Sequence, residues 1–97
     1  MPLVPIKSFA DKLTEAVFRG KPVKGFPSDI RRVAQRKLTM VNSATTLGDL
    51  RVPPNNKLEK LTKDRAGQHS IRINDQFRVC FRWQDGDAHD VEIVDYH

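Results

Sequence analysis

The 97-residue chain carries 17 lysines and arginines against 12 aspartates and glutamates, a formal net charge of +5. A chain of this length forms one domain with one modest core, since it buries only about 60 to 70% of its unfolded surface. The basic excess favours a polyanionic partner over an acidic metabolite. Cys80 is the one cysteine, which excludes an internal disulfide and favours the reducing cytoplasm. No apolar run approaches a membrane span and nothing resembles a signal peptide, so we expect a soluble protein without a membrane partner.

The start of the chain predicts a short strand and then a short helix. Residues 4–9 are a candidate edge strand, because Pro5 cannot donate a hydrogen bond within a sheet. Ser8 and Asp11 have the spacing of a capping box, so a helix is expected after them and Gly20 is expected to end it. The single domain is expected to span residues 1–97, with residues 1–5 as a candidate flexible extension.

A second, longer helix is the clearest element of the sequence. Ser28 is a suitable N-cap, and the helical pattern ends near Ser43. Apolar residues recur every three or four positions and predict one buried stripe, formed by Ile30, Val33, Ala34, Leu38 and Val41. The opposite face is expected to present the basic residues Arg31, Arg32, Arg36 and Lys37.

The middle of the chain predicts a connector and a short strand. Residues 45–50 are expected to hold one helical turn, and the prolines of residues 51–56 disfavour regular structure. Residues 57–61 are a candidate strand, with a bulge or an early end near Lys60.

A hairpin is the feature around which the rest of the chain is organised. Residues 68–73 and 77–83 alternate apolar and polar side chains on either side of a turn at residues 74–76. The turn dipeptide Asp85-Gly86 then introduces a last strand over residues 90–96. The predicted fold is therefore α+β: an N-terminal strand, two helices, and a mostly antiparallel sheet with the helices on one face and the other face open.

The second strand of this hairpin has two chemically different faces. One face is expected to build the core with Phe77, Val79, Phe81 and Trp83. The other carries Arg78, Cys80 and Arg82, and Arg72 of the preceding strand joins them. A row of guanidinium groups on a rigid sheet would form a cationic platform suited to phosphate. Three nearby acidic residues, Asp85, Asp87 and Asp90, are expected to gather in one turn away from this platform.

The ending Asp95-Tyr96-His97 combines a carboxylate, a phenol and an imidazole. Together these groups can accept, donate and relay protons, and an imidazole does so near neutral pH. A last strand beside the Arg78 strand would bring them within reach of the platform. A phosphodiester held by Arg78 would then meet a proton-transfer group.

Nearly the whole chain resembles the HigB toxins, members of the RelE/ParE superfamily. The resemblance rests on the order and spacing of five segments: Ile6-Lys7-Ser8-Phe9, residues 58–61, residues 65–71, residues 74–81 and Val94-Asp95-Tyr96-His97. It implies a toxin of a type II toxin–antitoxin pair, a metal-independent endoribonuclease that enters the ribosomal A site and cuts mRNA during translation. It also implies a HigA-type helix-turn-helix antitoxin, and operator DNA binding only through the complex of the two.

The resemblance also implies roles for individual residues. Arg78 would stabilise the transition-state phosphate, and Asp95, Tyr96 and His97 would transfer protons and orient the RNA. Some relatives have a catalytic histidine where this chain has Glu59, so Glu59 is a weaker catalytic candidate. The expected RNA-backbone contacts are Lys57, Lys60, Lys63, Arg65, Arg72 and Arg82.

The remaining histidines show no pattern typical of a metal or cofactor site. His69 is an alternative to the missing histidine, but it shares a strand face with Ile71 and Ile73, which favours a packed side chain. The histidines have no metal-ligand spacing and the chain has no glycine-rich phosphate loop, so we expect neither a metal nor a cofactor. Two alternative functions stay open: inhibition of DNA gyrase by binding, as in the ParE branch, and RNA binding without catalysis.

Overall fold

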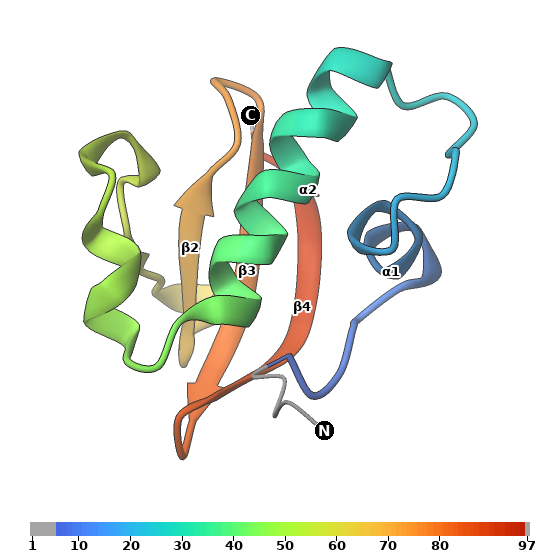
Figure 1. The fold of residues 1–97 in the computed structure, drawn as a ribbon. Helices are drawn as coiled ribbons and strands as arrows, with labels where there is room; N and C mark the ends of the chain where they lie inside the picture. Colours follow the sequence, from blue (N-terminus) through green and yellow to red (C-terminus); the bar gives the residue numbers. More distant parts are fainter. Residues whose placement is uncertain (1–5, 97) are drawn as a thin grey trace.

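The computed structural model describes residues 6–96 and places two helices against one face of a four-stranded sheet (Figure 1). The helices and strands are α1 (Lys12–Phe18), α2 (Ser28–Ser43), β1 (Glu59–Lys60), β2 (Gln68–Arg72), β3 (Phe77–Gln84) and β4 (Asp87–Asp95). The strands lie in the order β1-β2-β3-β4, and each pairs antiparallel with its neighbour. The predicted α+β class is confirmed. No helix within residues 6–96 has both the length and the apolar character needed to cross a membrane.

The segment before α1 runs along the outer edge of β4, as predicted for an edge strand, but it pairs at isolated points. Ile6 and Phe9 form single parallel bridges with Ala88 and Val91 of β4. Between these bridges, the Ser8 hydroxyl accepts a hydrogen bond from the Asp90 amide at 2.9 Å. The expected continuous strand is therefore wrong for the described part of this segment. Residues 1–5, including the start of that strand and the candidate extension, lie outside the described residues.

Helix α1 begins at a different cap from the one the sequence predicts. The N-cap is Asp11, whose carboxylate accepts a hydrogen bond from the Thr14 amide at 2.8 Å. The Ser8 hydroxyl is occupied by β4, so the predicted capping box of Ser8 and Asp11 does not form. The expected end at Gly20 is close to the observed one, because Gly20 takes a positive φ of 75° two residues after the helix.

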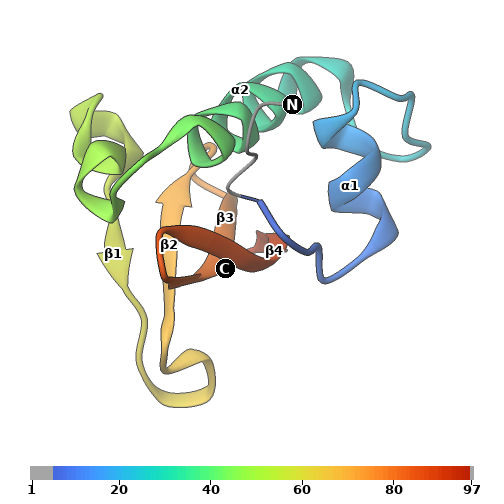
Figure 2. The same ribbon diagram turned by 60° about the horizontal axis from the view of Figure 1, so that its bottom comes forward.

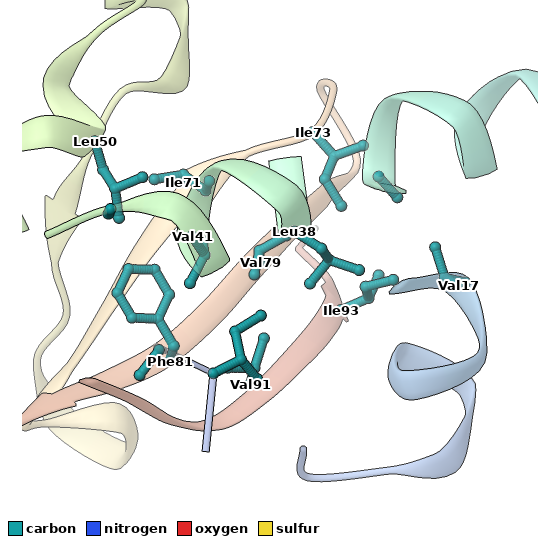
Figure 3. Close-up of a cluster of buried hydrophobic side chains, with 14 residues drawn as sticks. Val17, Leu38, Val41, Leu50, Ile71, Ile73, Val79, Phe81, Val91 and Ile93 are labelled. Atoms are coloured by element: carbon teal, nitrogen blue, oxygen red, sulfur yellow. The ribbon is translucent and has the colours of Figure 1, made fainter. Parts of the chain in front are cut away.

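Helix α2 crosses the sheet and buries the predicted stripe against it (Figure 3). Ala34, Leu38 and Val41 are fully buried, and they pack with the inner-face residues of the sheet, among them Ile71, Val79, Phe81, Val91 and Ile93. The predicted N-cap is wrong by one residue: Ser28 is the first residue of the helix and Pro27 is its cap. Lys37 corrects the expected exposed face: it is only 6% exposed and its ammonium donates to the Asn56 side chain at 2.6 Å.

The hairpin β2–β3 has the predicted faces. Ile71 lies opposite Val79 on the inner face, and Arg72 lies opposite Arg78 on the outer face. Strand β1 is shorter than predicted, because Lys57 and Lys63 adopt positive φ values that bend the chain on both sides of it. The expected early end at Lys60 is confirmed.

The centre of the outer face of the sheet is buried, although both helices lie on the other side (Figure 2). Ser70 and Cys80 occupy neighbouring positions on this face and are both 0% exposed. The expectation of an open face is therefore only half right: no helix covers it within residues 6–96, but its centre is closed to water.

Thr14 links α1 to the sheet through one buried hydrogen bond. Its hydroxyl accepts from the Ile93 amide at 2.9 Å, and the side chain is fully buried. We expect Thr14→Val to lower the free energy of unfolding by about 1 to 3 kcal/mol, because the Ile93 amide is then buried without a partner. Urea denaturation measures this change. Thr14→Ser keeps the hydroxyl and serves as the control. A valine variant as stable as the wild type would show that this hydrogen bond contributes nothing to stability.

Candidate functional site

Arg78 lies at the centre of a small cluster on the outer face of the sheet. It comes from the first half of β3, between Arg72 of β2 and Val94 of β4. Its Nη1 atom is 3.8 Å from a carboxylate oxygen of Glu59. Its Cζ atom is 5.1 Å from the centre of the Tyr96 ring, which is the geometry of a cation–π contact. We call Glu59, Arg78 and Tyr96 the Arg78 cluster.

The guanidinium of Arg78 keeps hydrogen-bonding capacity for a ligand. Its Nη1 atom is buried and has no hydrogen-bond partner among residues 6–96, since the Glu59 oxygen is beyond hydrogen-bond distance. The Ser70 hydroxyl, buried on the same face, has no partner in the described residues either. Buried polar atoms without partners are rare and mark functional sites more often than other positions. Ser70 was not expected here, although its alternation with Arg72 along β2 puts both residues on one face.

The end of β4 reaches the hairpin turn, and Tyr96 contacts Arg78 there. The Tyr96 amide donates to the Gln76 carbonyl at 2.6 Å, which fixes the end of β4 beside the turn. Asp95 pairs with Phe77 in register and accepts a hydrogen bond from the Gln76 side chain at 3.1 Å. Asp95 therefore occupies the strand position that alternates with Val94, not the one on the Arg78 face. His97 lies outside the described residues.

The arginine row is present, but it is not the bare cationic platform that the sequence predicts. Each arginine of this face has a carboxylate within ion-pair distance. Arg78 faces Glu59 as described above, and the remaining pairs are Arg72 with Asp75, Arg65 with Glu92 at 3.3 Å and Arg82 with Asp90 at 3.6 Å. Asp90 is thus not gathered with Asp85 and Asp87 as expected. A bulge opposite Phe81, where Asp90 takes a φ of 53°, turns its carboxylate towards Arg82.

The other expected RNA contacts spread along the β1 side of the sheet. Lys57, Lys60 and Lys63 are exposed and flank or form β1. Arg82 extends over Gly67, where an added Cβ would come within 2.9 Å of its Nη1 atom. These side chains form a broad basic border and do not converge on one point.

Two polar side chains that could carry chemistry are held in inert surroundings. His69 packs beside Phe81 with ring centres 6.1 Å apart, and burial together with Lys60 lowers the pKa of its imidazole. Burial raises the pKa of the Cys80 thiol to about 11, so it is protonated near neutral pH and a poor nucleophile. Both observations agree with a structural role. Within residues 6–96, no group of three or more histidine, cysteine or acidic side chains is placed to hold a metal ion.

A sequence model of the RelE-like HigB toxins of type II toxin–antitoxin systems matches residues 7–97. Toxin HigB-1 of Vibrio cholerae is 40% identical over 81 residues, which cover 82% of this chain and 85% of that protein. Endoribonuclease HigB of Proteus vulgaris is 34% identical over 93 residues, which cover 95% of this chain and 99% of that protein. The match runs through the Arg78 cluster and nearly the full length, and the chain therefore belongs to the HigB-like family of type II toxins.

Proposed function

We propose that this toxin is an mRNA endoribonuclease that cuts RNA on the ribosome by attack of a ribose 2′-hydroxyl on the adjacent phosphate. One observation supports it most: a partly buried arginine with an unpartnered N–H group lies between an aromatic ring and a carboxylate. The relative from Proteus vulgaris is named an endoribonuclease, which agrees with this activity.

The reaction needs three contributions from the protein. A base takes the proton of the 2′-hydroxyl as the new O2′–P bond forms, and an acid gives a proton to the 5′-oxygen as the P–O5′ bond breaks. A positively charged group is also needed beside the pentavalent phosphate, to stabilise the negative charge on its oxygens. The products are a 2′,3′-cyclic phosphate and a 5′-hydroxyl, and no oxidant or water is consumed.

Arg78 supplies the positive charge in this proposal. The guanidinium is partly exposed and can donate to a phosphate oxygen, and preorganised donors of this kind are worth a factor of about 10² to 10³ in rate. Tyr96, Asp95 and His97 supply proton transfer and orientation of the RNA. Glu59 is a candidate base, and its ion pair with Arg78 offsets the repulsion that a carboxylate would otherwise exert on phosphate.

The ribosome is needed in this proposal because the free site is incompletely arranged. Asp95 is hydrogen-bonded at the turn, away from the Arg78 face, so a bound RNA must be aligned by something else. The A site of the ribosome presents mRNA in a fixed conformation. The surrounding basic residues then hold its backbone: Lys57, Lys60, Lys63, Arg65, Arg72 and Arg82.

A type II toxin is paired with an antitoxin, and the family therefore implies an antitoxin partner for this chain. In the finer proposal the partner is a HigA-type helix-turn-helix protein, and only the complex binds operator DNA. The cytoplasm is the expected compartment, since ribosomes and a neutralising antitoxin are found there. The domain boundary is proposed at residues 1–97.

The experiment is a translation reaction with the purified toxin, followed by mapping of the mRNA ends. We expect cuts within translated codons, with a 5′-hydroxyl on the downstream fragment, and no cuts in the same RNA without ribosomes. We expect equal cutting after the ribosomes are stabilised by polyamine and a chelator removes free divalent metal. Intact transcripts together with inhibited DNA gyrase would instead select the ParE-type function. Intact transcripts with retained RNA binding would select the non-catalytic alternative.

A further inference from the structure

A basic pocket lies under α2 at the edge of β2, on the side of the sheet opposite the Arg78 cluster, and Arg72 belongs to both regions. Its volume is about 340 Å³, and its lining residues are Val33, Arg36, Lys37, Asn55, Arg72, Ile73 and Asn74. The lining has three cations, two amides and no carboxylate. Asp75 meets Arg72 at an exposed position and does not line the pocket. This region differs from the arginine row, where a carboxylate accompanies every guanidinium.

The pocket exists because β1 is so short. Strand β1 pairs only with His69 and Ser70, so it does not extend along β2 as far as Arg72. The chain instead returns through the short 3-10 helix η2 (Pro54–Asn56), which contacts β2 and brings Asn55 to the pocket rim. Helix α2 closes the pocket from above with Arg36 and Lys37.

Lys37 is a fixed charge in the wall of this pocket. The side chain is 6% exposed, and its ammonium donates to the Asn56 carbonyl oxygen at 2.6 Å. Asn56 is itself held by bonds from its amide to the Leu50 and Val52 carbonyls. An ammonium has three donors, and Asn56 accepts the one hydrogen bond that Lys37 makes within residues 6–96. Burial, Arg36 and Arg72 all lower the pKa of Lys37, so the pocket holds positive charge that a bound anion would relieve.

The amide groups favour a phosphate over a simple counter-ion. The Asn74 oxygen accepts the Gln76 and Phe77 amides at 2.9 and 2.7 Å, which fixes this pocket-lining side chain, and its NH₂ group is a further donor. A phosphate has several acceptor oxygens and fits a set of guanidinium, ammonium and amide donors.

The position of the pocket favours RNA as the source of that phosphate. Arg72 of the pocket and Arg78 of the cluster are directly opposed, so their Cα atoms are only about 5 Å apart. Both lie next to the hairpin turn to which Tyr96 is bonded. Arg72 occupies an outer-face position beside Arg78 and also lines the pocket on the α2 side, so an RNA strand whose scissile phosphate meets Arg78 can reach the pocket by passing over the open edge of β2.

We infer that this pocket, through Arg36, Lys37, Arg72, Asn55 and Asn74, binds a backbone phosphate of the RNA substrate next to the one that is cut. The inference rests on the proposed function for the identity of the RNA, but the binding itself needs no cleavage. The pocket is a positioning site: it sets how the strand lies over Arg78.

The test uses binding of a fluorescent, fully 2′-O-methylated oligoribonucleotide, which cannot be cleaved because it has no free 2′-hydroxyl. The pocket variant is Arg36→Gln with Asn55→Ala, since both residues are exposed and can change without disturbing the core. Arg32→Gln is the matched control: it removes the same charge from an exposed position on the same helix but does not line the pocket.

We expect the pocket variant to raise Kd roughly tenfold, and the salt slope of log K to fall by about 0.7, the loss of one single-strand phosphate contact. The control is expected to change Kd less than about twofold, because Arg32 does not line the pocket and an exposed charge one helical turn away acts through screening solvent. In wild type, the Asn74 side-chain NMR signals are expected to shift on RNA addition. Equal binding by the two variants would overturn the inference. So would normal RNA binding with loss of antitoxin binding, which would assign the pocket to an acidic polypeptide.

These outcomes separate the inference from the nuclease proposal. RNA binding that depends on the pocket, without cleavage on ribosomes, would contradict the nuclease proposal and support the inference about the pocket. Cleavage on ribosomes, with RNA binding that does not depend on the pocket, would support the nuclease proposal and overturn the inference about the pocket.

Discussion

Arg78→Gln is expected to lower the rate of mRNA cleavage on ribosomes by a factor of about 10² to 10³, because the substitution removes positive charge beside the reacting phosphate. Glutamine keeps part of the length and the polarity of the side chain. The variant loses a 3.8 Å ion pair with a half-exposed Glu59, worth about 0 to 1 kcal/mol of stability, and a cation–π contact with Tyr96, worth about 0.5 to 1 kcal/mol. The expected loss is therefore one of activity in a folded protein, measured by end mapping and by circular dichroism.

Arg78→Lys separates charge from shape in this position. Lysine keeps the charge but not the planar fork, so we expect an activity between those of the wild type and the glutamine variant. A folded Arg78→Gln protein that cuts as fast as wild type would remove Arg78 from the chemistry. A lysine variant as inactive as the glutamine variant would assign the whole effect to the fork geometry.

Tyr96→Phe is expected to lower cleavage by about 10² or more, because the phenol hydroxyl is then lost as a proton-transfer group. The ring remains, so the contact with Arg78 at 5.1 Å is kept. The variant therefore tests the hydroxyl alone. Single-turnover cleavage on stalled ribosomes is the measurement, since it follows the chemical step and not toxin release.

Tyr96→Leu completes this comparison. It removes the ring as well, and with it a cation–π contact worth about 0.5 to 1 kcal/mol at a partly exposed position. We expect the leucine variant to be slower than the phenylalanine variant. If phenylalanine is harmless and leucine is not, Tyr96 acts by orienting Arg78 or stacking on a base, and the proton comes from another group.

The sheet and α2 were predictable because their patterns are long and regular. The alternation from Phe77 to Trp83 fixes which side chains are inside, and pairing with β2 follows from the turn at residues 74–76. The stripe of α2 similarly specifies its buried face. Short elements were less predictable. The Ser8 hydroxyl can either cap α1 or accept a hydrogen bond from β4, and the local sequence does not indicate which of these partners it has.

Side-chain partners distant in sequence were the part that the sequence could not provide. Lys37 appears on the polar face of α2, and only the fold brings it to Asn56, 19 residues away. The ion pair of Arg82 with Asp90 depends on a bulge that no residue type announces. The same holds for Glu59, whose approach to Arg78 needs the bend at Lys57. The placement of Tyr96 near Arg78 was predictable, because strand order and register determine it.

The carboxylate beside each arginine of the sheet has a consequence for selectivity. An RNA that approaches these arginines exchanges one anion for another, so it gains only the difference between a phosphate contact and an existing ion pair. RNA that is free in solution therefore gains little binding free energy from this surface. An RNA strand that another macromolecule already holds has lost its conformational entropy beforehand. For that strand, the small difference in interaction free energy is enough for binding. In the proposed mechanism, this exchange of anions favours RNA that is presented to the toxin over RNA that the toxin must capture from solution.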